Sequence, residues 1–285
     1  MSARGAPPAR IPRAVASLLW CAIALLVPIT ITSSVVRTIA VIDPGAAIVE
    51  LQRWILRSLN SDSAFLMQMA RDMPRLDGRY LAHRTVTLLH VVPGALFLAL
   101  APFQFSARMR NNHIRFHRWS GRVLIVAAMI SALTGLYPGV VIPFAGAGEA
   151  SSIAVFGALI LVALTQGFLA IRNGDVARHR EWMIRAFAVA IGVSTIRVVG
   201  VAVQAVRPVS LESLMVSSFW IGWVITVGVA EIWIVRSRQI EGGGKPPHSE
   251  VTSTSSRRCR SVVRGTGSAF HSPRGRCRRA GGSTP

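Results

Sequence analysis

The sequence predicts an all-α protein, an integral membrane helical bundle with six transmembrane helices. Apolar residues make up 51% of its 285 residues and charged residues only 15%, below the share of charge typical of a soluble domain. The apolar residues form long runs, each able to cross a hydrocarbon core of about 30 Å. Arginines gather in alternate connections between these runs, which is typical of a chain that crosses a membrane several times.

The first apolar run, 14–36, follows Arg4, Arg10 and Arg13. A signal peptide has the same polarity, but its apolar region usually spans only about 7–15 residues. This run is longer and no small-x-small cleavage site follows it, so we expect an uncleaved membrane anchor. The other five predicted helices cover 85–105, 123–144, 152–171, 183–206 and 213–235.

The charge of the connections predicts the orientation. Segments 1–13, 106–118 and 172–182 carry three, four and three Arg, whereas 145–151 carries none and 207–212 carries one. The positive-inside rule therefore places both termini on the cytoplasmic side of the cell membrane. Segment 37–84 would lie outside despite its seven Arg, because long translocated loops follow the rule poorly.

Four segments follow from this pattern. Segment 1–36 holds the cytoplasmic N-terminus and the first helix, and 85–235 is a five-helix membrane domain. The extracytoplasmic loop 37–84 contains apolar residues near helical spacing, namely Ile48, Leu51, Ile55 and Leu59. This pattern indicates an amphipathic helix on the outer leaflet. Segment 236–285 has eleven basic and two acidic residues without apolar periodicity, so we expect a disordered cytoplasmic tail.

The net charge of +20 does not indicate a nucleic-acid partner, because the basic residues lie in the tail and in short loops between apolar runs. The partner that this distribution favours is the lipid bilayer, with anionic phospholipid at the cytoplasmic face. Nothing in the sequence specifies an oligomeric state.

An internal repeat marks the cytoplasmic face. Shifting the sequence by 62 residues aligns two copies of the pattern Gln-x5-Arg-Asn-x5-His-Arg. The aligned pairs are Gln104 with Gln166, Arg110 with Arg172, Asn111 with Asn173, His117 with His179, and Arg118 with Arg180. The second to fifth helices then form a four-helix bundle from two parallel, pseudo-repeated hairpins.

The repeated histidines suggest a cofactor. His117 and His179 would sit at the same depth in the bundle, where two imidazoles can ligate one haem iron axially. Arg118 and Arg180 would then face the anionic propionates of a b-type haem. The alternative is that each histidine caps a helix start or contacts lipid head groups.

A bare metal ion is not expected. His113 and His117 have the i, i+4 spacing of two ligands on one helix face, but four Arg surround them and the loop contains no carboxylate. That charge disfavours a divalent cation and suits an anion.

Charged and polar side chains inside the apolar runs form a second candidate site, because such residues are costly in lipid. His90 and Arg197 would lie in the outer half of the bundle, together with Gln204. Arg185 and Glu231 have similar depths, so we predict that they pair.

Several stretches resemble the family of membrane proteins called domain of unknown function 2306. They are LLHVVPGALFLALAPFQF (88–105), HRWSGRV (117–123), GDVARHREWMIRAFAV (174–189) and WIGWVITVGVAEIWI (220–234). Ala101 stands where the family tends to have Gly. The resemblance covers about 80–235; it implies the membrane fold and points to the same polar residues, but implies no reaction.

Three functions remain open at this stage. The first is a redox protein with haem between His117 and His179. The second is a transporter or channel for a proton or small anion that uses His90 and Arg197. The third is a structural membrane protein that binds anionic lipid through its basic loops.

Overall fold

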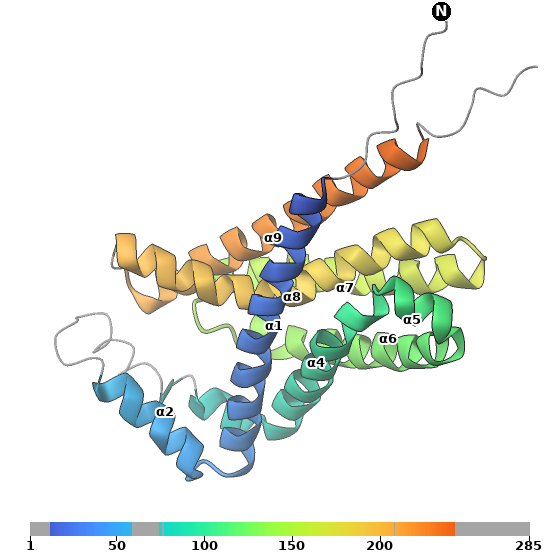
Figure 1. Ribbon diagram of the computed structural model, residues 1–285. Coiled ribbons are helices and arrows are strands. Elements are labelled where there is room, and N and C mark those ends of the chain that lie inside the picture. The colour runs from blue at the N-terminus through green and yellow to red at the C-terminus, as the bar shows by residue number, and fades with distance from the viewer. Residues whose placement is uncertain (1–11, 59–73, 76, 208, 243–285) are drawn as a thin grey trace, which may run out of the picture. The chain divides into compact units, whose positions relative to one another are not determined.

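The computed structural model describes residues 12–58, 74–75, 77–207 and 209–242. These residues form helices and connections, with no strand among them. Six helices are long and apolar enough to cross a membrane, as predicted (Figure 1). They are α1 (Arg13–Ile42), α4 (Arg84–Gln104), α6 (Ile114–Leu136) continued by the π-helical turn η1 (Tyr137–Val141), α7 (Ala147–Arg172), α8 (Val176–Val206) and α9 (Leu211–Gly242).

Among the described residues there are also two shorter helices, and 77–82 is helical as well. The amphipathic helix expected after the first span is α2 (Ala47–Ser58), on which Ile48 and Leu51 are exposed. Leu59, the last residue of the predicted apolar stripe, lies outside the described residues. Helix α5 (Ala107–Asn112) lies in the connection between α4 and α6.

Most helices extend past the apolar runs, because polar side chains at their ends find partners. α1 continues beyond Val36 since Arg37 pairs with Asp77 at 2.5 Å and lies over the Tyr80 ring. α8 begins at Val176, seven residues before the predicted start, because Asp175 caps its first turn.

The last helix also runs further than predicted. α9 was expected to end at Val235 but extends to Gly242, so the first residues of the expected tail are helical. The rest of that tail, 243–285, lies outside the described residues.

Helix α8 lies at the centre of the packing. It is the most buried of the six apolar helices and packs against α9, α7, α1 and α4. Its contact with α1 includes a hydrogen bond between the hydroxyls of Thr30 and Ser194. Because α8 also packs against α1 and α9, the four helices α4, α6, α7 and α8 do not form a bundle that is separate from the other two. The four-helix bundle built from two repeated hairpins remains a prediction.

Candidate functional site

The internal repeat is visible where two helices begin. α6 starts at Ile114 and α8 at Val176, which are 62 residues apart. His117 and His179 are thus each the fourth residue of their helix. The connections before these helices lie at the same end of the molecule, which we call the basic end because it carries 105–118 and 172–182 (Figure 1).

The two copies differ in how the connection is built. In the second copy α7 continues to Arg172 and a short turn leads to α8. In the first copy α4 ends at Gln104 and a separate helix, α5, follows. Pro102, two residues before the end of α4, aligns with Leu164, which lies inside α7.

The histidines have unequal hydrogen bonding. His179 Nδ1 lies 2.8 Å from the carbonyl oxygen of Gly167. The carbonyl at the equivalent position, that of Phe105, instead accepts a bond of 2.8 Å from Arg110. His117 Nδ1 is consequently buried without a hydrogen-bond partner among the described residues. His117 and His179 are close enough to influence each other electrostatically.

Gln104, in the same repeat copy as His117, has a second buried atom without a partner among the described residues. Gln104 donates from Nε2 to the Ser120 hydroxyl at 2.9 Å, but its Oε1 is buried without a partner in the described part of the chain. The repeat-related Gln166 is half-buried on α7. A buried polar atom without a partner costs about 1–3 kcal/mol, so such atoms call for an explanation.

Arg185 and Glu231 form the predicted ion pair. Arg185 Nε and Nη2 donate to the two carboxylate oxygens of Glu231 at 2.5 and 2.9 Å. The Arg185 guanidinium also lies over the Trp182 ring, 4.6 Å from its centroid. The pair joins α8 to α9 near the basic end.

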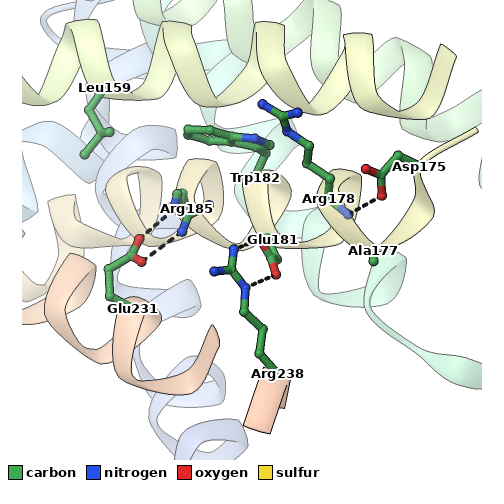
Figure 2. A pocket seen from close by; sticks show the side chains of 9 residues that line it. All are labelled: Leu159, Asp175, Ala177, Arg178, Glu181, Trp182, Arg185, Glu231 and Arg238. Carbon is green, nitrogen blue, oxygen red and sulfur yellow. Dashed lines mark hydrogen bonds and ion pairs between the residues drawn. The ribbon is translucent and has the colours of Figure 1, made fainter. Parts of the chain in front are cut away.

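This pair lines an open pocket of about 690 Å³ (Figure 2). A second ion pair, between Arg238 and Glu181, lies beside it. Asp175 Oδ1 accepts a hydrogen bond of 2.9 Å from the backbone N–H of Arg178. The Arg178 guanidinium points away from Asp175, on the same side of α8 as the Trp182 ring (Figure 2).

The family model described as Predicted membrane protein (DUF2306) matches residues 87–234, more than half of the chain. The chain belongs to this family. The matched region contains the candidate residues His90, His117, His179, Arg197 and Glu231. Arg238 lies outside it. No curated protein and no solved structure matches the chain.

Within the family region, His90 joins two helices. His90 Nδ1 lies 2.8 Å from the Ser131 carbonyl oxygen, and the Ser131 hydroxyl donates to the His90 carbonyl at 2.7 Å. A Cβ atom at Gly135 would lie 2.5 Å from the His90 ring, so glycine makes room for the imidazole. These contacts connect α4 with α6.

The other residues of the predicted outer site have different partners. Gln204 bonds to both the N–H and the carbonyl of Val209, at 3.3 and 3.4 Å, and so fixes the turn between α8 and α9. Arg197 donates to the Val193 carbonyl of its own helix at 2.7 Å and is close enough to Tyr80 to interact electrostatically. The structure thus gives His90, Arg197 and Gln204 separate surroundings.

The pocket around Trp182 was missed at the sequence level. Arg238 was assigned to the tail, so its pairing with Glu181 was not considered. A signal did exist: Glu181 and Arg185 lie four residues apart on α8, and Glu231 and Arg238 lie seven apart on α9. Both spacings place the two side chains on one helix face.

Proposed function

We propose that this protein is a membrane-bound redox protein that holds a b-type haem between His117 and His179. The observation that carries the proposal is the placement of two equivalent histidines at one end of the molecule. One of them, His117, has a buried ring nitrogen with no hydrogen-bond partner among the described residues. Haem supplies one-electron chemistry, and the chain supplies the ligands and their surroundings.

The donor set suits haem better than a bare metal ion. A porphyrin provides four nitrogen ligands, so the protein needs to add only two. Among the described residues there is no group of three or more histidine, cysteine or acidic side chains, as a protein site for a bare ion would need. His117 and His179, at equivalent positions, would supply the two ligands that a haem iron needs from the protein.

The hydrogen bonding of His179 is typical of a ligand. A histidine that donates from Nδ1 to a backbone carbonyl has its tautomer and ring orientation fixed, with the lone pair on Nε2. The Gly167 carbonyl plays this part for His179. For His117 the equivalent Phe105 carbonyl is occupied by Arg110, so the ring keeps a nitrogen that is available for another partner.

Arginines of the basic end would neutralise the propionates. Arg118 and Arg180 each follow one of the histidines directly, and both are exposed at the ends of their helices. A guanidinium binds a carboxylate in a bidentate manner, which would orient the group at this end.

The absorption spectrum of the detergent-purified protein tests the proposal. We expect the reduced protein to show the sharp bands of a six-coordinate b-type haem. His117→Ala and His179→Ala should each abolish these bands, because each removes one of the two side chains that would hold the haem iron. The matched control is His113→Ala, which removes a neighbouring imidazole at the helix start and should leave the spectrum unchanged.

The opposite results are equally clear. A colourless protein from cells supplied with haem precursor contradicts the proposal. So does a spectrum that survives both substitutions at His117 and His179. Size-exclusion chromatography of each variant separates loss of haem from loss of folding.

A further inference from the structure

We propose that the pocket lined by α7, α8 and α9 at the basic end (Figure 2) binds the phosphate of an anionic phospholipid headgroup, with Arg178 as its main contact. This inference is independent of haem, because its main contact, Arg178, is not among the residues assigned to the haem iron or its propionates.

Among the described residues that line the pocket, Arg178 is the one cation that is in no ion pair. Arg185 is neutralised by Glu231 and Arg238 by Glu181. Asp175 is engaged by the backbone N–H of Arg178 in capping α8. Within the part of the chain that the structure describes, no carboxylate forms an ion pair with the Arg178 guanidinium. An anion would meet this group without displacing an existing pair.

The walls of the pocket favour a lipid over a soluble anion. Leu159, Ala177 and the Trp182 ring supply apolar surface beside the charged side chains. A volume of about 690 Å³ is far more than one inorganic phosphate needs. A tryptophan next to arginines at the end of a membrane helix is typical of the interface where lipid headgroups lie.

The same surroundings favour an anionic lipid over a zwitterionic one. Glu181 and Glu231 are already paired, so they offer little to a positively charged headgroup amine. One face of the Trp182 ring is occupied by the Arg185 guanidinium, and an aromatic face is the usual platform for choline. Arg172 and Arg180, on the same stretch of chain, add further positive charge.

Native mass spectrometry of the delipidated full-length protein tests the site. The protein is titrated separately with phosphatidylglycerol, phosphatidylcholine and inorganic phosphate. We expect phosphatidylglycerol to bind more tightly than phosphatidylcholine. Arg178→Gln should weaken phosphatidylglycerol binding about fivefold, the usual effect of one basic residue on binding to anionic lipid.

A matched control separates the site from general charge. Arg115→Gln removes the same charge from the start of α6, outside the pocket, and should leave the affinity for phosphatidylglycerol unchanged. Arg178→Lys should retain most of the binding. A thermal melt of each variant confirms that it is folded.

Three results would overturn the proposal. The first is equal binding of both lipids, and the second is an unchanged affinity in Arg178→Gln. The third is displacement of the lipid by inorganic phosphate at the same concentration, which would identify a soluble anion as the ligand. None of these results bears on the absorption spectrum, so this proposal and the haem proposal can fail separately.

Discussion

Arg185 and Glu231 show how charged side chains are accommodated in helices that are otherwise apolar. The Arg185 side chain is only 15% exposed, whereas that of Glu231 is 42% exposed. A guanidinium this deeply buried and without a partner would be costly in a membrane. The two-point hydrogen bond with Glu231 removes that cost and holds α8 against α9 at one depth.

A double-mutant cycle measures this pair. We expect Arg185→Met and Glu231→Gln to be coupled by about 2 kcal/mol in the free energy of unfolding, because each hydrogen bond joins two charged groups. Unfolding in mixed detergent gives the value. A parallel cycle of Arg185→Met with Glu212→Gln, at the other end of α9, should show no coupling; a similar value in both cycles contradicts the assignment.

At the scale of the elements, the contact between α8 and α9 depends on a close approach of their backbones. A Cβ atom on Gly222 would lie 2.8 Å from the backbone nitrogen of Ile196 and 2.9 Å from its Cα atom. Backbone atoms cannot rotate away as a side chain can, so glycine is required at this position. At Gly228, on the same helix, no atom of the described residues lies within 4 Å of the equivalent point.

Substitution of these two glycines tests the close approach. Gly222→Ala should destabilise the protein by about 2 kcal/mol, because overpacking forces the helices apart. Gly228→Ala should leave the stability unchanged or slightly higher, since alanine favours a helix and meets no obstacle. Thermal unfolding in detergent compares the two variants. Equal effects at both positions would show that helix propensity, and not the approach of α8 and α9, decides the outcome.

At the scale of the whole molecule, the six helices make the chain a multi-pass membrane protein, and its orientation rests on charge. The connections from α4 to α6 and from α7 to α8 are rich in Arg, while those from η1 to α7 and from α8 to α9 are not. Positive residues are retained on the cytoplasmic side during insertion. The basic end is therefore predicted to face the cytoplasm.

Reporter fusions in bacteria test this orientation. A fusion after residue 242 should give fluorescence with green fluorescent protein and no activity with alkaline phosphatase, which needs an oxidising compartment. A fusion after residue 145 should give the reverse result. If both patterns are inverted, the basic end faces outward and the charge rule fails for this chain.

Much of the fold was predictable because the hydropathy that specifies a membrane helix is a property of a short stretch of chain. A run of apolar residues is sufficient to specify a membrane helix, so all six were found from hydropathy alone. The repeated His-Arg motif marked the starts of α6 and α8 in register. The depths of Arg185 and Glu231 were enough to predict their pairing.

The sequence by itself determined the number of helices, the repeat and the residues with the chemistry for a site, since these depend on short stretches of chain. Only the tertiary structure decided which of them meet. Helix rotation and packing pair Arg238 with Glu181 and place the His90 ring against the Ser131 carbonyl. They also leave His117 Nδ1 without a hydrogen bond of the kind that His179 makes, among the described residues. Contacts of this kind join residues far apart in the sequence, and hydropathy carries no information about them.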